Sequence, residues 1–524
     1  MSLLVRSAKD LLSLKRVNMD WKIKLNGLSM LSCLSWGMLS LSQVANAVPA
    51  QDLSSSSRSR SWFSSVVDRD DPTSQRLLGE LEHLSSQFEK RASSLSLNQV
   101  LDQGLINNPS LASAFFDIQG SEWSLIASRR SWYPAFQLTG TTANYKGQPN
   151  VLIGKAYTAS TTNTSTSSVT QYSQPEAVAP VLVLNWSFFD PTRTPAINQV
   201  LSGLMAQRFL FDIAARNLIL NLQTAYTDVQ AESELIRRYR WLFDLTHEQV
   251  LAAESMARQG KLSRTALDQL HTEQRLQLTR LIDRYQLLFT ASNALAALVA
   301  VPPGQLVLAA SPFTLEGPWP QDLDTSLQQA LAMREEIKQK LSLAERDRWA
   351  AIRTINSYLP VFGLTGGATY DDTQTLSSSV QASKANFGLS FQWSFFDGGV
   401  KAADATNLRA QSASQRSAAD SQRLLVAKQV MDAYNVYVTS KLALQNTGSD
   451  FALSRQTVRD AVRAFRANGD VTTLVQVFNL YVSAADRDVG STRQFNTSIY
   501  GLYRYSALWP EGLSQKVSHR LGGA

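Results

Sequence analysis

The chain has 524 residues, a net charge of +7 and one cysteine, Cys33. Residues 1–47 hold six Lys or Arg and two Asp, so the rest is near +3 and lacks the concentrated basic surface of a nucleic-acid-binding protein. The residues after 47 contain no cysteine, which excludes disulfides and thiolate metal sites there, and no late segment is apolar enough for a spanning helix, so a membrane crossing would have to use strands.

Residues 1–47 have the features of a signal peptide. Lys22 and Lys24 precede a fairly apolar stretch, and residues 45–47, Ala-Asn-Ala, fit a small-x-small cleavage site. Met19 opens a better leader than Met1 and is the alternative start. An uncleaved anchor helix and a lipoprotein modified at Cys33 are the other readings, and the second is disfavoured by a poor lipobox.

Residues 48–94 are rich in Ser, Arg and Asp with little periodicity, which predicts a variable, mobile N-terminal periplasmic segment. A helix is predicted from about 97 to 132, where Tyr133-Pro134 breaks it.

Strands are predicted at about 135–145 and 181–190, and again at about 361–371 and 387–397. Bulky apolar residues at 387, 389 and 391 alternate with Gly388 and Ser390, which is the period of a strand with lipid on one face and water on the other. The loop between the first two strands is rich in Ser, Thr and Gly. The phrase Trp-Ser-Phe-Phe-Asp ends the second strand of each pair, at 186–190 and 393–397.

A long helical pattern follows each phrase. Residues 196–300 contain no proline and only two glycines, and a helix from 196 to 258 would be roughly 95 Å long. Gly260 predicts a reversal, with Ser263 as the N-cap of the returning helix. Gly469 predicts the same kind of reversal, with Thr472 as the N-cap of the returning helix.

The chain therefore consists of two copies of one unit. We place the first repeat at 95–301, with its hairpin turning at Gly260, and the second at 323–509, with its hairpin turning at Gly469. A proline-rich linker, 302–322, joins them, and 510–524 is a C-terminal tail.

No catalytic constellation is present in the sequence. His247 and His271 lie on opposite arms of one predicted hairpin, but two surface histidines are the simpler explanation, and no glycine-rich phosphate loop occurs. We expect no enzyme activity, no metal and no cofactor.

Aromatic residues gather at the strand ends and at the helix-to-strand junctions, as in the interfacial belts of membrane proteins. The alternative is ordinary core packing. The girdle candidates are Trp132, Tyr133, Trp186, Phe188, Phe189, Tyr358, Trp393, Phe395 and Phe396.

These features together resemble the TolC-like outer membrane efflux protein family over about residues 95–509. The resemblance rests on residues 105–111 (Leu-Ile-Asn-Asn-Pro-Ser-Leu), on Tyr-Pro at 133–134 and Leu-Pro at 359–360, on the two Phe-Phe-Asp strand ends and Gly-Gly at 398–399, and on residues 257–263 (Ala-Arg-Gln-Gly-Lys-Leu-Ser).

The resemblance implies a mixed α+β membrane protein that forms a homotrimer. Four strands per chain would build a 12-stranded outer-membrane β-barrel, which a long periplasmic α-helical coiled-coil tunnel continues. Four strands cannot close a barrel alone, so the sequence independently requires an oligomer.

The resemblance also implies partners, namely a periplasmic adaptor protein, an inner-membrane pump reached through that adaptor, and outer-membrane lipid. The adaptor-contact residues would be Gly260, Lys261, Leu262, Ser263, Gly469, Asp470, Val471 and Thr472. Where the family carries entrance aspartates, this chain has Val475 and Phe478, so an aspartate gate is not transferred and apolar packing is the expected closure.

The function expected from the resemblance is an exit duct in the outer membrane of a Gram-negative bacterium, with a large periplasmic part. It would serve a tripartite efflux or type I secretion system, with the cargo open between small molecules and polypeptides. The alternative is a non-transporting periplasmic coiled-coil scaffold, which explains the helices but not the amphipathic strands.

Overall fold

A computed structural model describes residues 74–142, 158–164, 167–173, 178–374, 379–510 and 517. The predicted signal peptide, most of the segment 48–94 and most of the C-terminal tail lie outside these residues.

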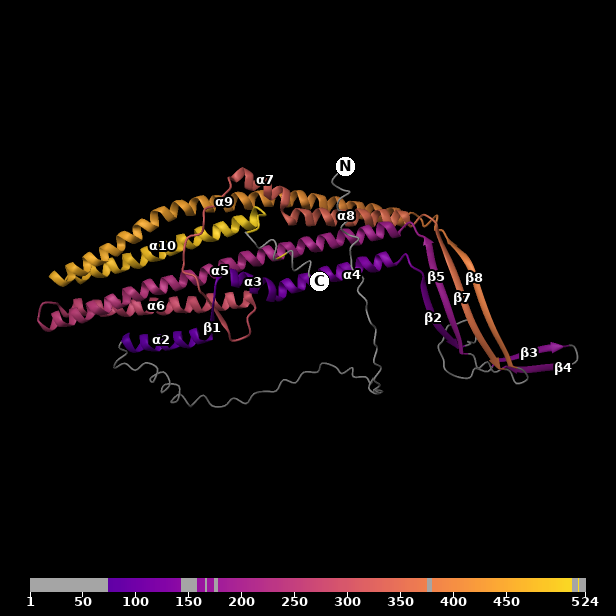
Figure 1. Cartoon of the computed structure of the whole chain (residues 1–524), viewed down its shortest axis with the longest axis horizontal. Helices are drawn as coiled ribbons and strands as arrows, with labels where there is room; N and C mark the ends of the chain where they lie inside the picture. Colours follow the sequence, from indigo (N-terminus) through magenta and orange to yellow (C-terminus); the bar gives the residue numbers. More distant parts are fainter. Residues whose placement is uncertain are drawn as a thin grey trace, which may run out of the picture. The chain divides into compact units, whose positions relative to one another are not determined.

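The helices of the first half are α2 (Ser74–Arg91), α3 (Leu97–Asn107), α4 (Pro109–Arg130), α5 (Arg193–Arg258) and α6 (Arg264–Val299). Those of the second half are α7 (Leu323–Met333), α8 (Glu335–Asn356), α9 (Val400–Asn468) and α10 (Val471–Tyr505). Each half thus ends in two long helices that lie side by side (Figure 1).

The single helix predicted over 97–132 is wrong, because α3 and α4 are separate. Asn108 between them is extended, with φ −64° and ψ 120°, since the ring of Pro109 disfavours the helical conformation in the residue before it. The Asn108 side chain accepts hydrogen bonds from the N–H groups of Ser110 and Leu111 and so caps α4.

Part of the segment predicted to be mobile is ordered and packed. Leu78 and Leu81 of α2 are buried, and the Phe88 ring lies 4.2 Å from that of Phe289 on α6. Strand β1 (Ala92–Leu95) follows α2 and pairs in parallel with β6 (Leu306–Ala309), which lies within the predicted linker. The expectation of a structureless segment failed because two buried leucines give too weak a periodicity to be read from sequence.

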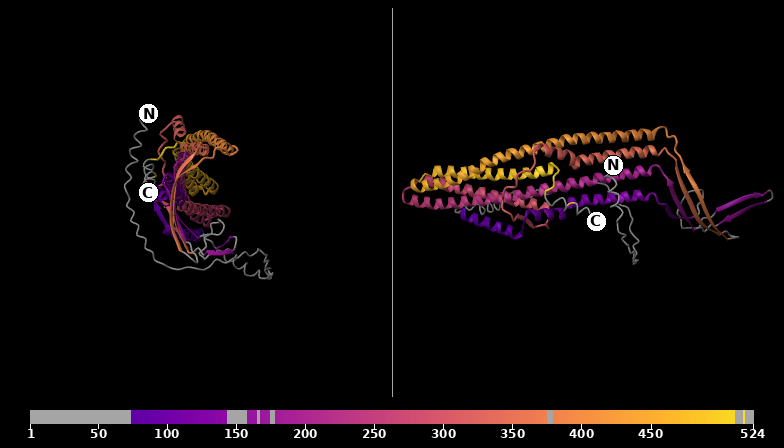
Figure 2. Two further views of the ribbon diagram at one scale, coloured as in Figure 1. Left: turned by 90° about the vertical axis from the view of Figure 1, so that its right-hand side faces the viewer. Right: turned by 45° about the horizontal axis from the view of Figure 1, so that its top comes forward.

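The main sheet has the strand order β2 (Ala135–Thr142), β5 (Val178–Phe189), β7 (Val361–Gln374) and β8 (Ser379–Gln392), with all neighbours antiparallel. Strands β3 (Thr158–Thr164) and β4 (Ser167–Ser173) pair with each other inside the predicted loop. The sheet continues from one end of the helices, as Figure 1 and the right-hand view of Figure 2 show.

The sheet has two open edges. Among the described residues, β2 pairs only with β5 and β8 pairs only with β7. The alternating residues Phe387, Leu389 and Phe391 on β8 are 71%, 81% and 60% exposed, so a row of large apolar side chains lies on the outside of this chain.

The second Trp-Ser-Phe-Phe-Asp phrase lies just after β8, whereas the prediction placed it inside the strand. Trp393 and Asp397 instead bond to the helix-to-strand junction and to the start of α9, as described below, which takes these residues out of the sheet.

The long helices form a layer. Helix α5 packs against α4 and α8 on the side of the sheet and against α6 and α10 farther away, and α9 packs against α8 and α10. The largest apolar cluster runs along α5, and it includes Phe211, Leu222, Val229 and Leu242. Leu218, Leu222, Ala225 and Val229 follow one another at intervals of four, three and four residues, and they form the seam of α5 on which the neighbouring helices pack.

Candidate functional site

The turn between α5 and α6 has the backbone conformation and the helix cap that its glycine and serine predict. Gly260 has φ +72°, a left-handed conformation that costs a residue without Cβ nothing. The Ser263 hydroxyl accepts a hydrogen bond of 3.1 Å from the N–H of Ala266 and caps α6.

The turn between α9 and α10 has the same glycine conformation but another cap. Gly469 has φ +73°. The carboxylate of Asp470, not the predicted Thr472, accepts from the N–H of Thr473 at 3.1 Å and from its hydroxyl at 2.6 Å. Thr472 is already the second residue of the helix, so its side chain is past the capping position.

The two turns touch each other. A Cβ on Gly469 would lie 3.4 Å from Leu262 Cδ1 and 3.5 Å from Met256 Cε. Slightly farther from the turns, Arg466 Nε of α9 donates to Gln249 Oε1 of α5 at 3.2 Å. The predicted adaptor-contact residues of both turns are therefore close together in this chain.

The two entrance candidates differ in burial. Phe478 is fully buried within the main apolar cluster, and Val475 is partly buried and packs against the same cluster. The Phe478 ring therefore contributes to packing between the hairpins and does not line an open space in this chain.

A polar belt crosses the helices farther from the turns. Arg284 of α6 donates to Asp486 of α10 at 2.9 Å, and the Tyr239 hydroxyl of α5 donates to the same carboxylate at 2.9 Å. Burial raises the pKa of Tyr239 to about 12, and the charge of Asp486 adds to this effect. Arg280 of α6 also donates to Asn479 of α10 at 2.8 Å.

Three arginines hold the C-terminal end of α10, and the sequence prediction missed them. Arg216 pairs with Glu335 at 2.9 Å and donates to the carbonyl oxygens of Ala507 and Leu508 at 3.1 and 2.9 Å. Its guanidinium lies 3.8 Å from the centre of the Trp509 ring. The signal for Arg216 in the sequence was a charged residue at a position where the helical pattern of α5 is otherwise apolar.

The other two arginines share one carboxylate. Arg334, 2% exposed, donates to both oxygens of Glu336 at 2.8 and 2.9 Å and to the carbonyl of Tyr505 at 3.1 Å. Arg504 donates to Glu336 at 2.6 Å. Burial alone would raise the pKa of Glu336, but the hydrogen bonds from Arg334 and the charge of Arg504 outweigh it and lower the pKa to about 2.

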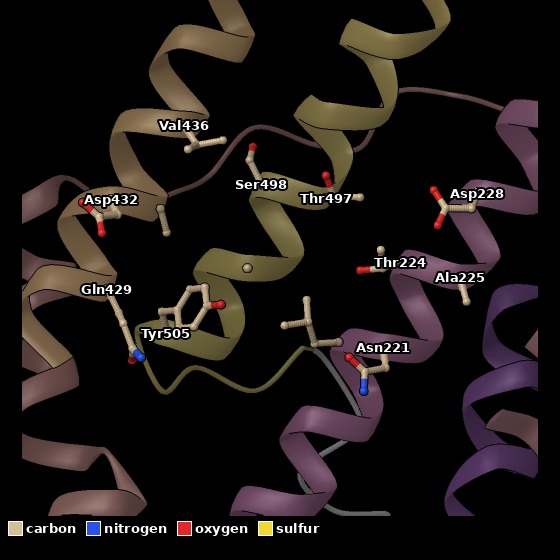
Figure 3. Close-up of a pocket in the computed structure, with 13 residues that line it drawn as sticks. Asn221, Thr224, Ala225, Asp228, Gln429, Asp432, Val436, Thr497, Ser498 and Tyr505 are labelled. Carbon is tan, nitrogen blue, oxygen red and sulfur yellow. The ribbon is translucent and has the colours of Figure 1, made fainter. Parts of the chain in front are cut away.

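A recess of 550 Å³ opens between α5, α9 and α10, beside this network (Figure 3). Asp228 and Thr224 of α5, Asp432 of α9, and Ser498 and Thr497 of α10 point toward it (Figure 3). Its lining thus combines these polar groups with apolar side chains such as Leu220 and Val436.

The linker lies across the other side of α10. Asn496 and Tyr500 bond there to the linker, the first through the carbonyl of Thr314 at 2.8 Å and the second through Glu316 at 2.6 Å. At 100° per residue, the mean directions of positions 496 and 500 and of positions 497 and 501 differ by about 100°, so the linker and the recess lie on different sides of α10.

The aromatic residues form the same hydrogen bond at both helix-to-strand junctions. The indole N–H of Trp186 donates to the carbonyl of Trp132 at 2.9 Å, and that of Trp393 donates to the carbonyl of Tyr358 at 2.9 Å. Of the girdle candidates, Tyr358 is half-buried and the others are exposed, namely Trp132, Tyr133, Trp186, Phe188, Phe189, Trp393, Phe395 and Phe396.

The aspartates that end the two phrases have a role that the sequence prediction missed. Asp397 accepts from the N–H groups of Gly399 and Lys401 at 3.0 Å each and from the Tyr358 hydroxyl at 2.7 Å. Asp190 accepts from the N–H of Thr192 at 2.9 Å. Both carboxylates satisfy N–H groups where a long helix begins.

The histidines stay separate. His247 Nδ1 lies 3.0 Å from Gln274 Nε2, and His271 Nε2 lies 3.6 Å from Glu254. Within the part of the chain that the structure describes, no three His, Cys, Asp or Glu residues gather as metal ligands, and no helix combines the length and apolarity that crossing a bilayer requires.

Comparison of the sequence with family models and with curated proteins gives no match. Solved structures do match. The Campylobacter jejuni CmeC outer membrane channel aligns with a TM-score of 0.66 at 14% identity, over 81% of this chain and 89% of that one. The outer-membrane channel OprN gives 0.62 at 16% identity, over 79% and 92%, and the open Neisseria gonorrhoeae MtrE outer membrane channel gives 0.60 at 15%, over 79% and 89%. The chain therefore has the fold of the TolC-like outer membrane efflux channels.

Proposed function

We propose that this protein is an outer-membrane exit duct of a tripartite efflux or type I secretion system in a Gram-negative bacterium. The observation that carries the proposal is a four-stranded sheet with two open edges and an exposed apolar row, set on long helical hairpins. A passage of this kind performs no chemistry on its cargo.

The open edges support a homotrimer. Edge strands present a row of unpaired N–H and C=O groups, and hydrocarbon does not satisfy them. Pairing of β8 in one copy with β2 in the next removes both edges. Three copies then give a closed barrel of twelve strands, which encloses an aqueous channel that continues between the helices.

The aromatic junctions support the position of the membrane surface. Indole rings are favoured where one side is apolar and the other is hydrated. Trp186 and Trp393 satisfy their N–H groups on a backbone carbonyl and keep much of their ring surface exposed, which suits residues at the boundary between lipid and periplasm.

The turns of the two hairpins are the proposed contact with a periplasmic adaptor, through which an inner-membrane pump would deliver cargo. Both turns sit together at the end of the helices away from the sheet (Figure 1). The buried Phe478 and the neighbouring Val475 fit an entrance that is closed by apolar packing, and opening then requires the hairpins to slide past one another at their turns.

The cargo follows from the pump and not from the duct. The recess presents both polar and apolar side chains and no cluster of one charge, which supports a wall that does not select between small molecules and extended polypeptides.

The first test is single-channel conductance of the purified protein in a planar bilayer. Discrete conductance steps from a trimer support the duct, whereas absence of any channel, together with release from outer membranes by a salt wash, would favour the periplasmic scaffold instead.

The second test separates the turns from the rest of the molecule. The double variant Gly260→Pro with Gly469→Pro should leave trimer and membrane insertion intact while abolishing export. Gly304→Pro is the matched control, since Gly304 has φ +89° but lies in the linker. Loss of the trimer in the double variant would show that the turns do not lie where we place the adaptor.

A further inference from the structure

Helix α2 has two different flanks beside its buried face. Leu78 and Leu81 form the buried face, which packs on α6. On one flank Glu82 reaches α5, where Arg240 Nη1 lies 2.5 Å from its carboxylate. That flank is therefore turned toward the middle of this chain.

The other flank of α2 carries two exposed leucines. Leu77 and Leu84 are seven residues apart, which is two turns, so they lie above one another. They are 40% and 55% exposed. At 100° per residue they stand on the opposite side of the buried pair from Glu82, and hence on the side of α6 that faces away from α5.

Helix α9 carries a matching apolar stripe on the opposite edge of the chain. Leu424, Met431, Leu442 and Leu453 follow one another at intervals of 7, 11 and 11 residues, which are close to whole numbers of turns. All four are exposed, and Leu453 is 67% exposed.

The two apolar surfaces lie at the same height along the helices. The Arg238 guanidinium lies 3.9 Å from the centre of the Phe451 ring, so this part of α9 is level with residues 238–240 of α5. Glu82 is at that level too, through its ion pair with Arg240. Because α2 runs toward the sheet and α9 toward the turns, Leu84 lies about 3 Å from this level on the side of the sheet and Leu453 about 3 Å from it on the side of the turns, which places Leu453 between the levels of Leu77 and Leu84.

Equal heights matter because copies in a ring are related by rotation about one axis. When that axis runs parallel to the helices, residues at the same height on the two edges meet in neighbouring copies. The ring that closes the sheet between β8 and β2 brings the α9 edge of one copy against the α6 edge of the next.

We propose that α2 is a strap between copies of this chain, with the Leu77 and Leu84 flank covered by the α9 stripe of the next copy around Leu453. The strap rests on the proposed trimeric duct. Strand β1 follows α2 directly and pairs with β6, so the strap is anchored on the linker of its own copy.

The test is a cysteine pair, Leu84→Cys with Leu453→Cys, in a Cys33→Ser background that has no other cysteine. A short bismaleimide should convert the purified trimer into covalently linked dimers and trimers on a denaturing gel. The matched control is Leu84→Cys with Leu424→Cys, because Leu424 is equally apolar and exposed but lies about 44 Å away along α9.

The outcomes separate the strap from the duct. Crosslinked oligomers with the first pair only, and none with either single cysteine, support the strap. A trimer that conducts ions but shows no crosslink overturns the strap and leaves the duct standing. Absence of a trimer by native mass spectrometry overturns both.

Discussion

The buried arginine at the junction of α7 and α8 gives the sharpest test of the packing described above. We predict that Arg334→Met loosens the end of α10 without unfolding the hairpins. The change leaves Glu336 with Arg504 as its one remaining arginine and leaves the Tyr505 carbonyl without its donor. The pKa of Glu336 should rise from its present value of about 2.

The expected magnitude follows from these contacts. Removing one partner of a buried ion pair costs about 3–5 kcal/mol, and this range already contains much of the cost of the orphaned carbonyl. At roughly 1.4 kcal/mol per tenfold change, a loss of about 4 kcal/mol raises the local opening equilibrium nearly a thousandfold. Met fills a similar volume, so little of this loss arises from a cavity.

The assay is native-state hydrogen exchange of the amides in residues 498–506, because a chain of this size with separate packed parts does not unfold in two states. Arg423→Met is the control, since Arg423 pairs with Asp420 on the surface and its loss should cost at most about 1 kcal/mol. Exchange that is unchanged in Arg334→Met, or equal in the two variants, would refute the assigned role of Arg334.

Three further changes test other parts of the structure. Asp212→Asn should stabilise the chain near pH 7.5 and have no effect near pH 3. Burial and then the charge of Glu335 raise the pKa of Asp212 to about 6, so the stability that this carboxyl contributes is present below its unfolded pKa and is lost as pH rises through 6. Melting temperatures of the two proteins at the two pH values test this. Gly469→Ala and Gly260→Ala should each cost about 1–2 kcal/mol for the left-handed backbone. Only the first should also change exchange in the opposite turn, because a Cβ at Gly469 contacts Leu262 and Met256, whereas nothing lies within 4 Å of a Cβ at Gly260; equal exchange maps would mean that the turns do not touch. Asp397→Ala should speed exchange at residues 399–403, and unchanged protection there would exclude a capping role.

Features encoded within a few neighbouring residues could be predicted from the sequence. The alternation at 387–391 specifies a strand with one apolar face, and a glycine between two long helical patterns specifies a turn such as that at Gly260. Cap identity needed finer geometry, because Asp470 and Thr472 are both good caps and only the position of the first helical residue decides between them.

Features that depend on distant residues could not be predicted. Arg216 and Glu335 are 119 positions apart, and nothing local marks either as a partner of the other. The same holds for β1, which is ordered by pairing with β6 more than 200 residues later. Helix α2 was missed for a related reason, since its buried face is defined by α6.

The layer of helices alternates between continuous and divided members. Helix α5, with 66 residues, and α9, with 69, run without interruption from turn to sheet, each about 100 Å long. Each neighbouring position in the layer is occupied by two shorter helices in succession. Helices α8 and α4 lie nearer the sheet, and α10 and α6 lie nearer the turns. The continuous helices resist bending along their whole length. At each divided position, by contrast, we expect the helix nearer the turns to tilt without moving the helix nearer the sheet. A force applied at the turns therefore meets two unbroken helices and two divided positions, and we expect the divided positions to yield first.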